Sequence, residues 1–199
     1  MGCWISIAHK MRIIAGDFRG RLLQSVRDLS VRPTTDRAKQ TIFDILTNRI
    51  SFVGLDVLDL FAGSGSLGLE AVSRGIKTVT FIDKSRKSIG VLEKNIASLG
   101  CEAQCSVYQA DVFWYLKNIH KTFDLIFVDP PYSLENIGTL PNAIYDSGSV
   151  HESTYIVMEH SKQSAIMLDE QKYEILKKPF GQTTVLILKA IVPPTLSRT

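Results

Sequence analysis

Cysteine is scarce in this chain of 199 residues, and no secretory signal precedes its first patterned segment. The three cysteines, Cys3, Cys101 and Cys105, are odd in number. Such usage is typical of reduced thiols in the cytoplasm and argues against a secreted disulfide scaffold. No second pair of Cys or His at ligand spacing follows Cys101 and Cys105, so we expect structural thiols and no metal site.

Long apolar runs are also missing, because none reaches the roughly 18 residues that a membrane-spanning helix needs. Low-complexity tracts and internal repeats are absent, which argues against a linker-rich or repeat protein. Hydrophobic residues make up 45% of the chain and charged residues 22%, which suffices for one well-filled domain with a small appendage. We therefore expect a cytoplasmic protein that does not contact membranes.

Positive charge is unevenly distributed along the chain. Between Lys10 and Arg49, nine basic residues stand against four acidic ones, whereas the formal charge of the whole chain is +3. The remainder is therefore slightly acidic, and we expect the positive field to be concentrated beside the glycine-rich turn at residues 63–68. A polyanion such as RNA or DNA is a natural partner for such a field, and a solvated basic surface is the alternative.

The segment 57–68, VLDLFAGSGSLG, combines a short apolar run with three closely spaced glycines, Gly63, Gly65 and Gly68. An apolar helical pattern follows, so the segment predicts a strand, a tight turn and a helix N-terminus. Glycine lets the backbone turn and lets a ligand approach the main chain closely. The free N–H groups of the helix then favour a polar or anionic group. This pattern indicates a nucleoside-binding unit without identifying the ligand.

Strand and helix patterns alternate after this turn. Strands are predicted at 78–82, 103–109 and 123–128, and helices at 89–99 and 112–119. Further on, a weak helical stretch runs to Tyr145, a strand is predicted at 154–159, and the segments 173–177 and 183–189 read as a closing antiparallel pair. The alternation predicts an α/β fold with a doubly wound, mostly parallel sheet, helices on both faces and an antiparallel C-terminal hairpin.

The N-terminal part is predicted to extend this domain. Residues 1–10 match a myristoylation pattern but are interpreted as a disordered leader, because Met11 directly precedes the first patterned segment. Residues 11–24 predict a small β-hairpin with arginines on its exposed side, and the helix after Pro33 runs to Ile50. The expected division is therefore a leader (1–10), an RNA-facing extension (11–50), the main domain (51–190) and a frayed tail (191–199).

Acidic residues stand where four predicted strands end, namely Asp59, Asp83, Asp111 and Asp129. Carboxyl ends of parallel strands meet at one edge of a sheet, where such folds bind ligands. There, Asp83 can accept from ribose hydroxyls, Asp111 from an adenine amine, and Asp59 can face an ammonium group. Together these groups describe S-adenosylmethionine. For each aspartate, a helix cap or a turn is the alternative interpretation.

Asp129 is followed by Pro130, Pro131 and Tyr132. Two prolines stiffen the backbone, so the Asp129 carboxylate and the Pro130 carbonyl can accept from one planar amino group. The Tyr132 ring can stack on the base that bears this group. An aromatic amine is a poor nucleophile, and it is aided by hydrogen bonds that favour a tetrahedral nitrogen and by in-line placement. A merely rigid loop is the alternative.

With these residues in view, the chain resembles a known family. The motifs VLDLFAGSGSLGLEA, FIDK, Ala110-Asp111 and VDPPY are similar to those of class I S-adenosylmethionine-dependent amino methyltransferases. MRIIAGDFRGRLL and RPTTDRAKQTIFDIL resemble the N-terminal signature of bacterial 16S rRNA guanine-N2 methyltransferases of the RsmD type. The resemblance covers about residues 11–189, although the segment 134–151 is too irregular to align.

The resemblance implies a seven-stranded sheet and a monomer that methylates the N2 amine of one guanine in 16S rRNA, within a small-subunit particle. It implies a catalytic role for Asp129, Pro130 and Tyr132. The implied cofactor-binding residues are Asp59, Phe61, Ala62, Gly63, Gly65, Asp83, Lys84, Asp111 and Val112. The implied substrate-binding residues are Arg19, Arg21, Arg32, Thr34, Thr35 and Arg37, of which the last four could equally form a helix cap with its surface charges.

Three other functions compete with this interpretation. DNA adenine-N6 methyltransferases share the Asp-Pro-Pro-Tyr motif, although 199 residues leave little room for a target-recognition domain. An NAD-dependent oxidoreductase could use the glycine turn but would leave Asp129-Pro130-Pro131-Tyr132 without a role. A non-catalytic RNA-binding assembly factor could retain the fold, and a test of activity distinguishes it.

Overall fold

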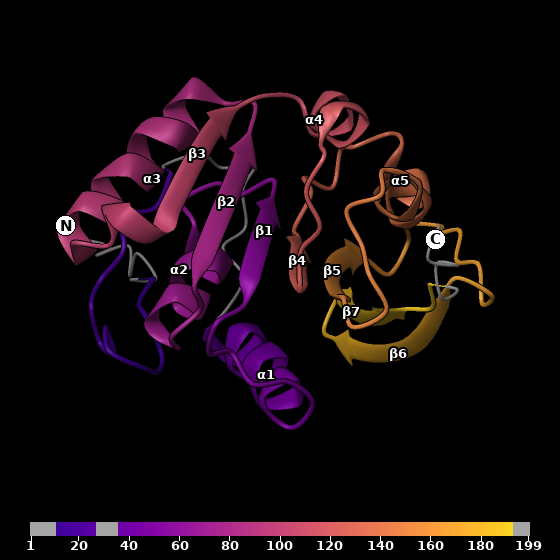
Figure 1. Ribbon diagram of the computed structural model, residues 1–199, viewed down its shortest axis with the longest axis horizontal. Helices are drawn as coiled ribbons and strands as arrows, with labels where there is room; N and C mark the ends of the chain where they lie inside the picture. Colours follow the sequence, from indigo (N-terminus) through magenta and orange to yellow (C-terminus); the bar gives the residue numbers. More distant parts are fainter. Residues whose placement is uncertain (1–10, 27–35, 193–199) are drawn as a thin grey trace, which may run out of the picture.

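The computed structural model describes residues 11–26 and 36–192, and helices and strands alternate along most of them (Figure 1). The helices are α1 (Asp36–Thr47), α2 (Ser66–Ser73), α3 (Arg86–Leu99), α4 (Val112–Asn118), α5 (Leu140–Asp146) and the short 3-10 helices η1 (Glu102–Gln104) and η2 (Ile137–Thr139). The strands are β1 (Asp56–Leu60), β2 (Thr78–Asp83), β3 (Cys105–Gln109), β4 (Leu125–Val128), β5 (Tyr155–Ser161), β6 (Tyr173–Phe180) and β7 (Thr183–Ala190). The expected leader and most of the expected tail lie outside the described residues.

The strands form one seven-stranded sheet in the order β3-β2-β1-β4-β5-β7-β6. Neighbouring strands from β3 to β5 are parallel, whereas β7 is antiparallel to both β5 and β6. The predicted doubly wound sheet with an antiparallel C-terminal hairpin is therefore confirmed. The order reverses between β1 and β4, which is the position where folds of this kind bind ligands beyond the carboxyl ends of the strands.

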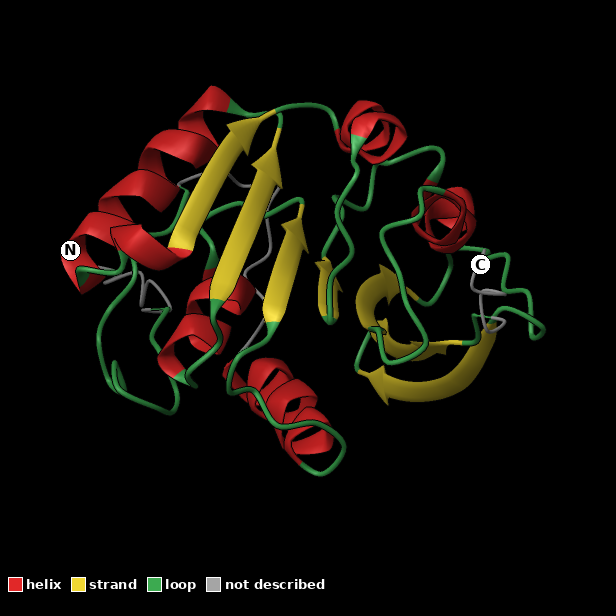
Figure 2. Ribbon diagram, in the orientation of Figure 1, coloured by secondary structure: helices red, strands yellow, loops and turns green. Residues whose placement is uncertain are grey.

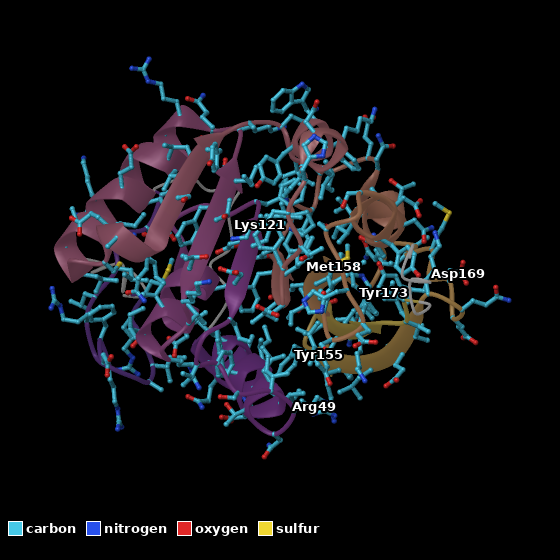
Figure 3. All side chains as sticks on the ribbon, viewed as in Figure 1. Arg49, Lys121, Tyr155, Met158, Asp169 and Tyr173 are labelled. Atoms are coloured by element: carbon cyan, nitrogen blue, oxygen red, sulfur yellow. The ribbon has the colours of Figure 1, made fainter. Side chains whose placement is uncertain are left out.

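Helices cover both faces of the sheet (Figure 2). One core packs α1, α2 and α3 against the sheet through side chains such as Phe43, Leu69 and Leu92. The other core packs α4 and α5 against the opposite face through Leu116 and Ile144. The labelled Met158 and Tyr173 lie on the α5 side in Figure 3, and the buried Tyr173 hydroxyl donates to the Pro141 carbonyl at 2.7 Å. Among the described helices, none is long and apolar enough to cross a membrane.

Most element boundaries agree with the sequence pattern to within two or three residues. Helix α3 ends at Gly100 as predicted, because this residue adopts the left-handed conformation (φ 71°) that closes a helix. Strand β3 begins at Cys105, two residues later than expected, because the preceding residues form η1 and the Gln104 amide bonds to the Cys101 carbonyl. The thiols of Cys101 and Cys105 are free, with their sulfur atoms 3.9 Å apart.

The predicted N-terminal hairpin is present as two short arms around an antiparallel bridge between Arg12 and Leu22. The Ile13 amide donates to the Arg21 carbonyl and the Leu23 amide donates to the Met11 carbonyl, each at 2.9 Å. The turn of the hairpin does not project freely, because the Asp17 amide donates to the Ser73 carbonyl at 2.8 Å. A Cβ atom on Gly16 would lie 1.7 Å from the same carbonyl oxygen, so only glycine permits this approach. The turn of the hairpin therefore docks on the end of α2.

A buried carboxylate joins this N-terminal segment to α2. Glu70 accepts backbone hydrogen bonds from Ile14 at 2.7 Å and Ala15 at 3.0 Å. Its charge is balanced by Lys39 of α1 at 3.6 Å and by Arg74 at 3.0 Å. Both Glu70 and Lys39 are fully buried, so each charge depends on the other for compensation. The Lys39 ammonium also donates to the Arg12 carbonyl at 2.6 Å, which closes the network.

We expect Glu70→Gln to lower the free energy of unfolding by about 3 kcal/mol, because it removes the charge that balances the buried Lys39. Urea unfolding followed by circular dichroism measures the change. Glu93→Gln, at an exposed position of α3, serves as the matched control and is expected to stay within about 0.5 kcal/mol of wild type. Equal stabilities of the Glu70→Gln variant and wild type would show that the network does not hold the extension.

Candidate active site

Three of the predicted aspartates gather at the carboxyl edge of the sheet. In the register of the parallel strands, Leu60 lies beside both Ile82 and Val128. Asp59 therefore stands near the end of β1, Asp83 ends β2, and Asp129 directly follows β4. This juxtaposition confirms the strand-end placement that the sequence predicted for these residues.

Asp59 is the most deeply buried of these acids, with 2% of its surface exposed. Burial, together with the negative charges of Asp129 and Asp83, raises the pKa of Asp59 to about 8, although a hydrogen bond from the Gly68 amide opposes the increase. That bond measures 2.9 Å. Asp59 therefore fixes the first turn of α2 and holds a proton near neutral pH, until a cation comes close enough to favour its charged form.

The three glycines of the turn serve different purposes. A Cβ atom on Gly65 would lie 2.4 Å from a methyl group of Leu92, and one on Gly68 would lie 2.3 Å from the Phe81 ring. These two positions require glycine for internal packing. At Gly63 (φ 57°), the nearest atom to an added Cβ is the Phe61 carbonyl oxygen at 3.9 Å. Of the three, Gly63 alone has no close neighbour that requires glycine, so the approach of a ligand to the main chain stays a prediction for this position.

Phe61 begins this turn in an unusual backbone conformation. Its φ of 59° is left-handed, which an L-residue with a side chain adopts at an energetic cost. The following residue, Ala62, donates its amide to the Ile82 carbonyl at 3.0 Å, so the neighbouring strand holds the turn in place. Strain of this kind at a strand end is typical of functional sites.

Asp83 ties the glycine turn to β2. One carboxylate oxygen accepts from the Gly63 amide at 2.8 Å, and the other accepts from the Ser85 amide at 2.8 Å. Each oxygen retains a lone pair for a further donor. The neighbouring Lys84 side chain is exposed, while its carbonyl accepts from the Gln109 amide group at 3.4 Å. Asp83 can thus hold the turn and accept ligand hydroxyls at the same time.

Asp111 has the role of a helix cap. Its carboxylate accepts from the Trp114 amide at 3.0 Å at the start of α4. The next residue, Val112, is buried in the core between α4 and the sheet. The alternative interpretation of Asp111 as a helix cap is therefore what the structure shows. A contact with adenine, as the sequence analysis expected, has to use the remaining acceptor capacity of the exposed carboxylate.

The Asp129-Pro130-Pro131-Tyr132 segment forms a turn that continues β4. The Asp129 amide reaches the Leu60 carbonyl at 3.5 Å, and the Pro131 carbonyl accepts from the Leu134 amide at 2.9 Å. Pro130 is buried, whereas the Tyr132 ring is 47% exposed. A carboxylate and an exposed aromatic ring therefore follow the strand within four residues, and their contacts with a base stay a prediction.

Glu159 adds an acidic residue that the sequence analysis missed. Val128 and Met158 are paired in the parallel register of β4 and β5, so the residues after them, Asp129 and Glu159, are neighbours. Side chains alternate along a strand, and both residues fall on the sheet face that packs against α1. The same signal, an acidic residue closing an apolar run, could have identified Glu159 within the predicted strand 154–159.

The predicted substrate-binding residues do not lie together. The exposed Arg37 is in the first turn of α1, where Lys39 donates to Ser66 at 3.3 Å beside the glycine turn. Arg21 instead donates its guanidinium to the Ser98 carbonyl near the end of α3, and Arg19 belongs to the turn docked on the end of α2. Because α2 and α3 begin at the carboxyl edge and finish at the opposite edge, Arg19 and Arg21 lie far from Asp129.

The expected concentration of positive charge beside the glycine turn is therefore wrong for these two arginines. The sequence shows their number but not the direction in which the docked hairpin carries them. Arg32, Thr34 and Thr35 lie outside the described residues. Among the residues that are described, no group of three or more His, Cys, Asp or Glu side chains is arranged to hold a metal ion.

The comparison with known proteins matches this geometry. The family model described as conserved hypothetical protein 95 covers residues 11–189. The chain belongs to this family. The "Ribosomal RNA small subunit methyltransferase D" of Haemophilus influenzae is 34% identical over 175 residues, which cover 86% of this chain and 90% of the relative. The resemblance to the RsmD type that the motifs predicted is thereby confirmed.

Solved structures with the same fold support the family assignment. The yhhF protein of Escherichia coli aligns with a TM-score of 0.79 and 30% identity, covering 91% of this chain and 98% of that one. A more distant structure, SMU.776 complexed with SAH, aligns with a TM-score of 0.63 and 17% identity, covering 76% of this chain and 49% of that one. At this low identity, the second likeness concerns the fold alone.

The raised pKa of Asp59 predicts a pH dependence of stability. The unfolded chain releases this proton near pH 4, whereas the folded protein keeps it up to about pH 8. The contribution of the Asp59 carboxyl to the free energy of unfolding is therefore fully present below pH 4 and is lost as the pH rises to about 8. Urea unfolding between pH 5 and 8 should show Asp59→Asn gaining stability relative to wild type as the pH rises. Parallel curves for the two proteins would contradict the assignment.

Proposed function

We propose that the chain transfers a methyl group from S-adenosylmethionine to the N2 amine of a guanine in small-subunit ribosomal RNA. The observation that carries the proposal is the position of Asp129. It follows β4 directly, beside the glycine turn and next to Pro130, whose carbonyl is a second acceptor. The name of the H. influenzae relative supports the substrate class, and the motif resemblance supports the guanine amine.

The residues at the carboxyl edge fit this cofactor. Asp59, Asp83 and Asp129 form a negative environment in which a sulfonium and an ammonium group would be stabilised. Gly63 leaves the main chain accessible, and Asp83 retains acceptor capacity for ribose hydroxyls. When bound, S-adenosylmethionine supplies an electrophilic methyl group. The SAH complex of a protein with this fold is consistent with that role.

The chain's own contribution is to hold the amine. The Asp129 carboxylate and the Pro130 carbonyl accept from the two amino hydrogens, which favours a more tetrahedral and more nucleophilic nitrogen. The exposed Tyr132 ring stacks on the base and fixes its plane. No strong base is needed before attack, and the proton released afterwards passes to Asp129 or to water. Most of the rate enhancement comes from this placement.

The neighbouring Glu159 favours guanine over adenine. Guanine presents an N1–H donor beside its N2 amine, whereas adenine presents an N1 acceptor beside its N6 amine. Two adjacent acidic residues, Asp129 and Glu159, complement two adjacent donors. Against adenine, the second carboxylate would face an acceptor, which costs binding energy. This arrangement supports guanine N2 over the DNA adenine-N6 alternative.

The spread of basic residues favours a large substrate. Arg37 lies near the carboxyl edge, while Arg19 and Arg21 lie at the opposite edge of the sheet. A short RNA around the target base cannot reach both groups, whereas folded small-subunit RNA or a small-subunit particle can. We therefore propose that a single copy of the chain acts on RNA within such a particle.

Asp129→Ala should lower methyl transfer by roughly 100- to 1,000-fold, because the amine loses the acceptor that aligns it. The assay incubates the protein with radiolabelled S-adenosylmethionine and, separately, with small-subunit particles, small-subunit RNA and DNA, followed by identification of the modified base. Calorimetry with S-adenosylhomocysteine should show that the variant still binds the cofactor product. Glu152→Ala, an exposed carboxylate outside the site, is the control.

The outcome separates the alternatives. N2-methylguanine in small-subunit RNA supports the proposal, whereas N6-methyladenine in DNA would replace it. RNA binding without any transfer by wild type would indicate a non-catalytic assembly factor. Full turnover by Asp129→Ala would refute the role of this carboxylate, whatever the substrate is.

Arg19→Ala should weaken binding to long small-subunit RNA and reduce the slope of log K against log salt by about 1, while leaving a short oligonucleotide unaffected. Arg19 is exposed on the docked turn, so the change leaves the core intact. Filter binding at several salt concentrations measures both quantities, with the exposed Lys178→Ala as the control. A loss that is independent of salt would point to a folding defect instead.

A further inference from the structure

Two exposed aromatic side chains stand beside the carboxyl edge, and neither has been assigned a role. Trp114 is 61% exposed and Tyr108 is 51% exposed, although rings of this size are usually covered. We call these two residues the aromatic platform. Tyr108 is in β3, the edge strand of the sheet, and Trp114 is in the first turn of α4. Figure 1 shows the chain passing directly from β3 to α4 at this edge.

The fold holds the platform in place without burying it. The Asp111 carboxylate accepts from the Trp114 amide at 3.0 Å, and the Asp111 carbonyl accepts from the Tyr115 amide at 2.9 Å. Tyr115 is half-buried, and its ring packs against Tyr108 with the centroids 6.0 Å apart. Tyr115 thus anchors the Tyr108 ring to the core, while Asp111 fixes the backbone at Trp114.

Exposed basic side chains belong to the segments next to the platform. Lys84 and Arg86 follow β2, the strand next to β3, and both are exposed. The Gln109 side chain donates to the Lys84 carbonyl at 3.4 Å, which places this basic segment beside the end of β3. Lys117 lies one turn after Trp114 on α4 and is also exposed. Exposed aromatic rings between basic side chains are the arrangement that binds single-stranded nucleic acid.

We propose that Trp114 and Tyr108 stack on unpaired RNA bases next to the target nucleotide, while Lys84, Arg86 and Lys117 contact the adjacent phosphates. The identification of the ligand as RNA rests on the proposed function. Because the platform lies at the carboxyl edge, it contacts RNA close to the flipped-out guanine. The arginines of the docked hairpin, at the opposite edge, contact a more distant part. The platform is thus a second, separate element of substrate recognition.

The chain contains two tryptophans, Trp4 and Trp114, so Trp4→Phe leaves Trp114 as the sole reporter of indole fluorescence. This variant, saturated with S-adenosylhomocysteine throughout, is titrated with a single-stranded RNA oligonucleotide of mixed sequence. We expect saturable quenching of the Trp114 emission, because stacking on a base quenches indole fluorescence.

Affinity variants test the energetics of the same contact. Trp114→Ala and Tyr108→Ala should each weaken binding of the oligonucleotide by roughly 5- to 150-fold. Trp114→Phe retains a ring and should restore most of the affinity. Met167→Ala, at another exposed apolar side chain, should bind as wild type does. Calorimetry should give the same affinity for S-adenosylhomocysteine in all four variants, which also shows that each is folded.

Three outcomes would overturn the proposal. If Trp114→Ala binds RNA as tightly as wild type does, the ring makes no contact with RNA. If this variant loses as much affinity for S-adenosylhomocysteine as for RNA, the ring belongs to the cofactor site. If the Trp114→Ala variant binds RNA normally but no longer binds small-subunit particles, the partner of the platform is a ribosomal protein. Quenching by RNA without methyl transfer by wild type would leave the platform standing and refute the proposed activity instead.

Discussion

The buried carboxylate of Glu70 is the contact on which the arrangement of the molecule depends. It accepts from the backbone of Ile14 and Ala15, balances Lys39 of α1, and belongs to α2, the helix that begins at the glycine turn. Every residue of α2 from Leu67 to Ser73 is buried, so a charge there is tolerated only with full compensation. The N-terminal extension supplies part of that compensation through Lys39 and the backbone amides, and Arg74 supplies the rest. Its position is therefore fixed relative to the turn on which the cofactor would sit.

A second constraint acts at the carboxyl edge, where negative charges are held together at an energetic cost. Asp59 keeps its proton because it is buried and because Asp83 and Asp129 lie close. A ligand that carries positive charge relieves this repulsion, whereas an anionic ligand increases it. The same carboxylates that suit S-adenosylmethionine thus disfavour the pyrophosphate of a dinucleotide, although the glycine spacing alone fits both. Electrostatics decides between cofactors where the glycine motif does not.

The sequence predicted what depends on local periodicity and missed what depends on docking. Strands, helices and their alternation followed from apolar patterns, and this alternation was enough to bring Asp59, Asp83 and Asp129 to one edge. The hairpin itself was predicted, but its docking was not, because Gly16 lets its turn contact Ser73, which is 57 residues away in the chain and belongs to no local pattern. For Asp111 the sequence could not decide between two roles, because a helix cap and a ligand contact both place an aspartate at this position.

The candidates for cofactor binding and for RNA binding lie in different parts of the fold. The cofactor-binding candidates occupy strand ends, whose geometry follows from the parallel sheet. The RNA-binding candidates occupy the docked hairpin, the first turn of α1 and the connection from β3 to α4, which the sheet does not determine. Substrate contacts can therefore change without disturbing the cofactor edge, provided that Glu70 keeps the extension in register with α2. The motif that follows β4 and the N-terminal extension are therefore separate candidates, the first for holding the amine and the second for contacting RNA.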